Sequence, residues 1–132
     1  MNTRRAWLCV PPILLALLDC VATSYGQPDQ YWRGDTGVAQ EDNPIVRWFM
    51  LLHPSAFFML TVVWIAAFCF GILKLPRVLA LMLALSVMVS HACCACTWLF
   101  PHNDGFYWSL ALCIGSAILF VLALELSRED AG

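Results

Sequence analysis

The sequence contains four long apolar runs, each about as long as a membrane-spanning helix. They cover residues 7–25, 55–73, 78–98 and 106–124, and Asp19 is the one Asp, Glu, Lys or Arg inside them. A helix of about nineteen residues extends roughly 28 Å, close to the hydrocarbon thickness of a bilayer. The chain of 132 residues is 61% hydrophobic and 12% charged, more apolar surface than a soluble domain of this length could bury. We therefore predict an all-α integral membrane protein, a four-transmembrane-helix bundle in a single domain over residues 1–132.

The segment between the first two runs is polar and then breaks twice at proline. Residues 26–43 carry five charged side chains and are typical of an exposed loop, which we place on the outer side. Asn43 followed by Pro44 predicts a helix start, and Pro54 predicts a second break. We interpret residues 44–52 as a short helix in the membrane interface, with Arg47 and Trp48 at headgroup level. One long tilted helix with a proline kink is the alternative.

The positions of the basic residues predict how the bundle is oriented. Arg33 and Arg47 fall on one side of the four spans, and the other five fall on the opposite side: Arg4, Arg5, Lys74, Arg77 and Arg128. Cytoplasmic segments carry the excess of Lys and Arg, so we expect both termini in the cytoplasm of a cell with the protein in its plasma (inner) membrane. Residues 1–25 also have features of a signal peptide; its cleavage would leave three spans in the same orientation.

Asp19 is the side chain that the first run is least suited to hold. A carboxylate at its depth costs about 3 kcal/mol unless it is paired, protonated or turned to a polar interior. Helical spacing places Pro12, Ala16, Asp19 and Thr23 on one narrow face, which we expect to point at the other helices. Asp19 is then either a hydrogen-bonded packing residue or a site for a proton, an ion or a substrate.

His91 lies at about the same depth as Asp19, which suggests a polar layer inside the bundle. We hypothesise that Asp19 and His91 face each other, because an acid–base pair lowers the cost of burying both groups. The alternative for His91 is a core histidine bonded to the backbone or to a serine. The full predicted layer comprises Asp19, Thr23, Thr61, His91 and Cys113.

The stretch from His91 to Cys96 contains residue types that are found in metal-binding and redox sites. Cys93 and Cys96 form a C-x-x-C with Cys94 between them, and residues three apart share a helix face. Together with His91 these thiols could bind Cu(I) or zinc, or form a redox pair. Cysteine is also an ordinary small filler in a membrane helix, and the motif stands alone. Our primary prediction is therefore no cofactor.

Four spans with a C-x-x-C near the outer face resemble the quinone-linked thiol oxidoreductases of bacterial membranes. The resemblance implies a quinone cofactor. Those enzymes also have a second cysteine pair in an outer loop, and residues 26–43 and 100–105 contain none. We keep a thiol-redox enzyme as an alternative only.

A second resemblance covers about half of the chain. The pattern from Asp19 to Thr23, the following polar loop, Asn43-Pro44 and the aromatic-rich second span resemble a group of small bacterial multi-span proteins of unknown function. It implies a bacterial inner-membrane bundle in which Asp19, Thr23, Asn43 and Pro44 form one structural unit. The family pattern also includes a lysine in the second span, which residues 59–63 lack, so His91 is left as the candidate partner of Asp19.

These observations predict a small structural or interaction subunit rather than an enzyme. Its partners would be the lipid bilayer and either a second copy of the chain or a larger membrane protein. The net charge of −2 and the absence of a basic tract argue against nucleic acid. The alternatives are a thiol-redox or soft-metal protein using His91, Cys93 and Cys96, and a proton-coupled transport component using Asp19.

Overall fold

The computed structural model is an all-α bundle, as predicted, and describes residues 3–101 and 103–128. A 3-10 segment η1 (Thr3–Cys9) continues directly into α1 (Val10–Gly26). The other long helices are α4 (Pro54–Lys74), α5 (Arg77–Leu99) and α6 (Gly105–Leu126). The helix formed by η1 and α1, and each of these three, is long and apolar enough to cross a membrane. Their bounds lie within a few residues of those predicted, and the described residues contain no strand.

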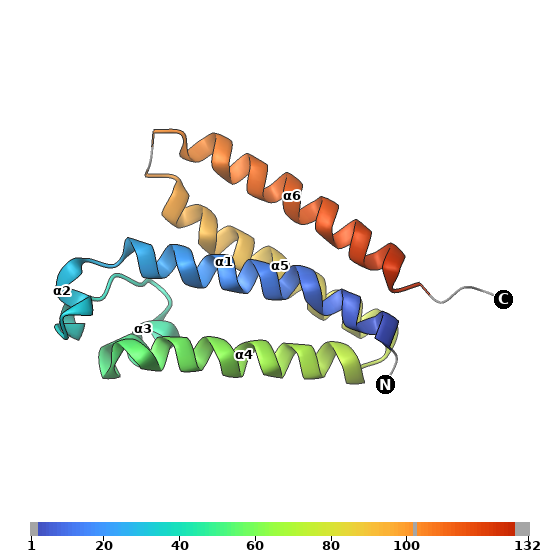
Figure 1. Ribbon diagram of the computed structural model, residues 1–132, viewed down its shortest axis with the longest axis horizontal. Coiled ribbons are helices and arrows are strands. Elements are labelled where there is room, and N and C mark those ends of the chain that lie inside the picture. Colours follow the sequence, from blue (N-terminus) through green and yellow to red (C-terminus); the bar gives the residue numbers. More distant parts are fainter. Residues whose placement is uncertain (1–2, 102, 129–132) are drawn as a thin grey trace.

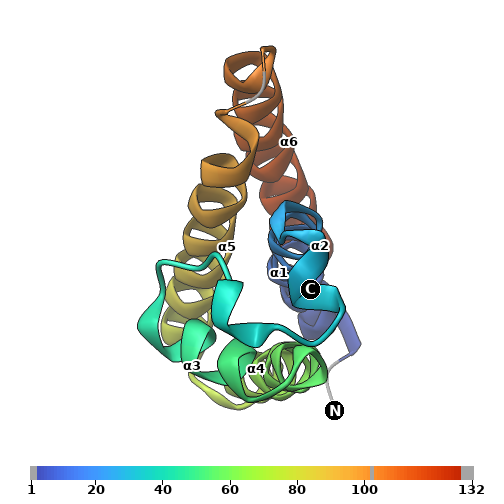
Figure 2. The ribbon, with the colours of Figure 1, turned by 90° about the vertical axis from the view of Figure 1, so that its left-hand side faces the viewer.

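The bundle is built around the contact between α1 and α5, the most extensive helix pair in the structure. Figure 1 shows the four long helices running roughly along one axis, with α1 in front of α5. In the end-on view of Figure 2, α4 lies below, α5 and α1 lie on either side, and α6 lies above them. Helix α6 packs mainly on α5 and on η1, and α4 packs on α5 and on the short helix that precedes it.

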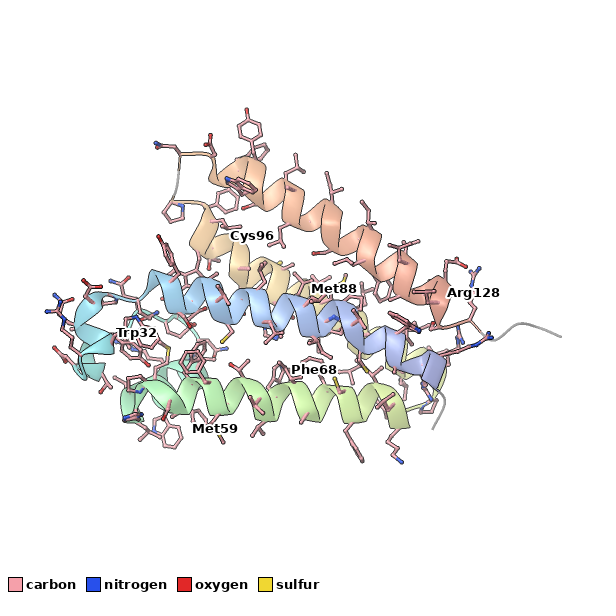
Figure 3. The ribbon with its side chains drawn as sticks, in the orientation of Figure 1. Trp32, Met59, Phe68, Met88, Cys96 and Arg128 are labelled. Atoms are coloured by element: carbon pink, nitrogen blue, oxygen red, sulfur yellow. The ribbon has the colours of Figure 1, made fainter. Side chains whose placement is uncertain are left out.

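Small side chains allow these helices to approach closely. Ala80 and Ala84, which lie four residues apart on α5, are both fully buried. In lipid there is no hydrophobic force between helices, so close van der Waals contact across small residues is what holds them. Larger side chains fill the remaining space, among them Phe68, which lies between α4 and α1 (Figure 3).

The inward face of α1 is the one that the sequence predicts. Pro12, Ala16 and Thr23 are buried, and the side chain of Asp19 is 15% exposed. Residues that lie between them in the sequence, such as Leu18 and Val21, are exposed to the surroundings of the bundle. Asp19 therefore points into the protein and not into lipid.

The segment after α1 is more ordered than the exposed loop that we predicted. It contains α2 (Asp29–Trp32) and a 3-10 turn η2 (Thr36–Val38), and Tyr31 is completely buried against Met50 and Phe57. The amide of Gln27 donates to the carbonyl of Gln40 (2.7 Å), and its oxygen accepts from the Gln40 N–H (2.8 Å). These contacts fold the segment back onto the bundle, which its polar composition did not indicate.

The short helix α3 (Pro44–Leu52) has the predicted bounds and is separate from α4. The Asn43 side chain caps it by accepting from the N–H groups of Ile45 (3.0 Å) and Val46 (3.3 Å). His53 has an extended backbone, so the chain turns between the two helices instead of kinking. Its ring Nδ1 accepts from the Ser55 N–H (3.1 Å) and caps α4.

Five of the seven Lys and Arg residues lie in segments at one end of the bundle. Figure 1 shows the start of η1, the α4–α5 turn and the end of α6 at the same end, opposite α2 and α3. There the Arg5 guanidinium donates to the carbonyl of Leu75, and the Arg4 guanidinium donates to the carbonyl of Arg128 (3.2 Å). The arginine-rich end is thereby tied together across three segments of the chain.

Candidate functional site

Asp19, His91 and Trp64 form one hydrogen-bonded cluster, in which Asp19 and His91 are largely buried and Trp64 is 46% exposed. The His91 Nδ1 and the Asp19 Oδ2 lie 2.8 Å apart, and the Trp64 indole N–H donates to His91 Nε2 over 3.1 Å. The predicted pairing of Asp19 with His91 is thus confirmed. The cluster joins α1, α4 and α5, and α6 contributes no member.

The indole of Trp64 fixes the tautomer of His91. An indole nitrogen is only a donor, so the His91 Nε2 that faces it must be unprotonated. A neutral imidazole carries one N–H, which must then be on Nδ1 and donate to Asp19. With His91 neutral and Asp19 ionised, the cluster has a net charge of −1.

The carboxylate of Asp19 is only partly satisfied. Its Oδ2 accepts from His91, but its Oδ1 is buried and has no hydrogen-bond partner among the described residues. The side chains of Asp19 and His91 are 15% and 20% exposed, so little solvent screens the charge. A buried carboxylate oxygen without a donor is costly, and such a group inside a membrane span points to a function.

The other predicted members of the polar layer have different partners. The Thr61 hydroxyl donates to the carbonyl of Phe57 (3.1 Å) and lies 3.7 Å from Cys20 Sγ. Thr23 is buried, and its carbonyl accepts from the Gln27 side chain (3.1 Å). Cys113 is on α6 and is exposed. The structure therefore brings together two of the five predicted residues directly.

The cysteines of α5 lie in different environments. Cys93 and Cys94 are exposed, Cys96 is buried, and all seven cysteines of the chain are free thiols. Among residues 3–101 and 103–128, no three His, Cys, Asp or Glu side chains are grouped to hold a metal ion. The geometry thus gives no support to a Cu(I) or zinc site built from His91, Cys93, Cys94 and Cys96, and that alternative stays a prediction.

Trp64 is the member of the cluster that the sequence analysis missed. Trp64 lies in the middle of α4, far from either end of the span. A tryptophan there cannot reach interfacial water, so its N–H needs a partner inside the protein. That requirement is the signal that could have identified it.

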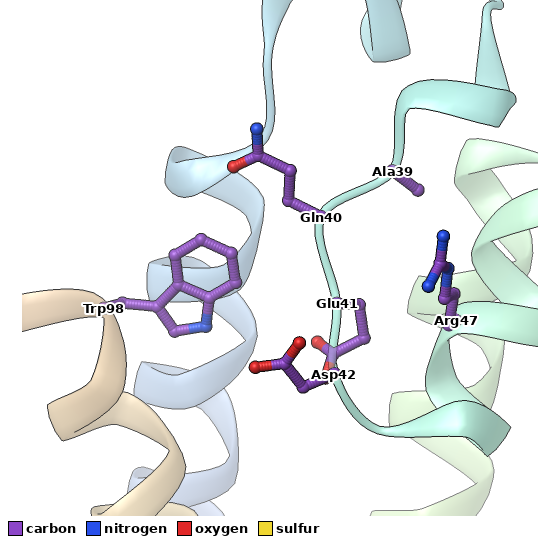
Figure 4. A pocket seen from close by; sticks show the side chains of 6 residues that line it. All are labelled: Ala39, Gln40, Glu41, Asp42, Arg47 and Trp98. Atoms are coloured by element: carbon purple, nitrogen blue, oxygen red, sulfur yellow. The ribbon is translucent and has the colours of Figure 1, made fainter.

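Glu41 is a second residue of interest, because it feels the charge of Asp19 from the segment between η2 and α3. It lines a pocket of about 350 Å³ together with Asp42, Trp98, Arg47, Gln40 and Ala39 (Figure 4). Burial raises the pKa of the Glu41 carboxyl above its usual value, and the negative charge of Asp19 raises it further. The Asn43 N–H donates to Glu41 Oε1 (2.8 Å) and opposes this shift in part.

The raised pKa of Glu41 predicts a pH dependence of stability. A group whose pKa is higher in the folded state contributes stability at low pH that is lost as pH rises through the folded value. Glu41→Gln keeps the oxygen that accepts from Asn43 and removes the charge. We expect the variant to be more stable than the parent above the pKa of Glu41, with the difference vanishing in acid. Unfolding in detergent across a pH series measures this, with Asp42→Asn as the control for net charge; an advantage of Glu41→Gln that is largest in acid would contradict it.

No family model, curated protein or solved structure matches this chain. The resemblance to small bacterial multi-span proteins therefore remains a prediction.

Proposed function

We propose that the protein is a small structural or interaction subunit of a membrane, without a catalytic role of its own. The proposal includes the plasma (inner) membrane as its location and both termini on the cytoplasmic side. The gathering of Arg4, Arg5, Lys74, Arg77 and Arg128 at one end of the bundle supports that orientation. The Asp19–His91–Trp64 cluster then serves to hold α1, α4 and α5 in one register.

The observation that carries the proposal is the outward face of α6. Helix α6 buries Gly105, Ser109, Ser116 and Ala123 against its own bundle. Two further small residues of α6, Ala111 and Gly115, do not face the bundle. Ala111 is exposed, and a side chain at Gly115 would meet nothing within 4 Å. Small residues four apart in a span are the usual surface for a second helix, so we assign this face to a helix of another membrane protein chain.

The outer end of α6 extends the same uncovered surface. Phe106, Tyr107 and Trp108 follow one another at the start of the helix and are 62%, 70% and 63% exposed. Aromatic side chains at this level anchor a helix in the interface and are also the residue types enriched where proteins associate. A partner that packs along Ala111 and Gly115 would pass close to them.

Ala111→Leu tests this surface. The larger side chain should keep a partner helix from approaching closely and reduce the associated fraction, while leaving the fold of the single chain unchanged because Ala111 is exposed. The measurement is the mass of the complex, by light scattering or native mass spectrometry, after mild detergent extraction from the native membrane.

The matched control is Ala117→Leu, the same change at an exposed position on a different face of α6. We expect association to survive Ala117→Leu. A protein that is monomeric in mild detergent before any substitution, or that loses association equally in both variants, would contradict the assignment of the partner surface to Ala111 and Gly115.

A further inference from the structure

We propose that the Asp19–His91 pair is a proton-binding site, which takes up one proton at Asp19 Oδ1. The inference is independent of the partner surface on α6, since it concerns the hydrogen-bonded cluster between α1, α4 and α5. It treats the proton as the ligand and needs no other cofactor.

The cluster carries a net negative charge when Asp19 is ionised. As the hydrogen bonds require, His91 is neutral, so an ionised Asp19 leaves one negative charge inside the span. No Lys or Arg lies inside the four apolar runs to neutralise it. Adding one proton takes the cluster from a charge of −1 to zero, and a neutral carboxyl is far better tolerated than a carboxylate away from water.

The hydrogen bonds of the cluster leave one basic atom that can accept the proton. His91 Nε2 is occupied by the indole N–H of Trp64, and a proton there would place two donors face to face. Asp19 Oδ2 is occupied by His91 Nδ1–H. Asp19 Oδ1 is the remaining basic atom of the cluster and has no partner among the described residues. Protonation at Oδ1 leaves both existing hydrogen bonds in place.

The surroundings of the pair supply a third observation. Cys20 of α1, Cys94 of α5 and Glu41 of the segment after α1 feel the charge of Asp19, and α4 presents the uncharged Trp64. Glu41 shares its pocket with Asp42 and with the cation Arg47.

The experiment combines two spectroscopic measurements on full-length protein reconstituted in phosphatidylcholine vesicles. Infrared difference spectra between neutral and acidic buffer should show a carboxylic acid C=O band that is lost in Asp19→Asn. Nitrogen-15 NMR of the imidazoles, assigned with His91→Gln, should show His91 protonated on Nδ1 alone on both sides of that transition. Aspartate carboxyl carbon-13 NMR of the parent protein gives the same test should Asp19→Asn not fold.

The absence of an Asp19-dependent carboxylic acid band overturns the proton site. His91 becoming doubly protonated while Asp19 stays ionised overturns the assignment of the proton to Oδ1. Neither outcome bears on the association tested with Ala111→Leu.

Discussion

His91→Leu is expected to lower the free energy of unfolding by about 3 kcal/mol near neutral pH, because it leaves the Asp19 carboxylate buried without its donor. An ordinary hydrogen bond between membrane helices contributes only about 0.6 kcal/mol on average. The size of the loss in unfolding free energy therefore distinguishes a buried, unpaired carboxylate from the loss of an ordinary hydrogen bond. Unfolding by sodium dodecyl sulfate, or a thermal melt in mild detergent, provides the measurement.

The double variant Asp19→Leu/His91→Leu completes the cycle. Replacing both members of a buried pair by apolar residues is often neutral or stabilising, so most of the lost stability should return. Ser90→Leu is the matched control, since Ser90 precedes His91 on the same helix and is exposed. If His91→Leu and Asp19→Leu each left stability unchanged, with no coupling between them, the pair would not stabilise the fold. A loss near 0.6 kcal/mol would mean that Asp19 is already protonated under the conditions used.

Gly105→Ala is the second substitution with a large expected effect. A Cβ at Gly105 would overlap the backbone carbonyl of Leu99, which cannot move aside as a side chain could. We expect a loss of about 3 kcal/mol, the upper end of the cost of overpacking, because α6 must shift relative to α5 to make room. The expected structural sign is a weaker contact between α5 and α6, seen as faster hydrogen exchange in the turn that joins them.

Gly115→Ala is the control within the same helix. A Cβ at Gly115 would meet nothing within 4 Å, so the same exchange should be close to neutral and could be slightly stabilising through helix propensity. Equal losses at Gly105 and Gly115 would show that the cost comes from the helix itself and not from the contact with Leu99.

The fold could be predicted from the sequence to a large extent, for a specific physical reason. A membrane-spanning helix must be apolar over a fixed length, and prolines and basic residues mark its ends, so the four long helices and α3 were predictable to within a few residues. Asn43 and Pro44 were correctly identified as the start of α3 because capping depends on neighbours in the sequence. The inward face of α1 followed from helical spacing alone.

The candidate site was predictable only in part. Asp19 and His91 could be matched because each is an expensive polar group at a similar depth, and pairing lowers the cost of both. Trp64 was missed because it counts as an apolar residue in a hydrophobic span, although its indole has one polar N–H group. The spacing of residues within one helix does not identify the neighbouring helix that provides the acceptor. Glu41 was missed because a polar loop does not show which of its side chains folds back over the bundle.

What the sequence determined by itself is the number, length and bounds of the long helices, the inward face of α1 and the need of Asp19 for a partner, since these depend on local composition and helical geometry. The tertiary structure decided the rest. It placed α1, α4 and α5 so that the Trp64 indole fixes the tautomer of His91 and leaves Asp19 Oδ1 without a donor. It also turned Ala111 and Gly115 away from the bundle, whereas Ala80 and Ala84 turned into it. Those outcomes depend on the rotation of each helix about its own axis, which is set by the packing of all the helices together.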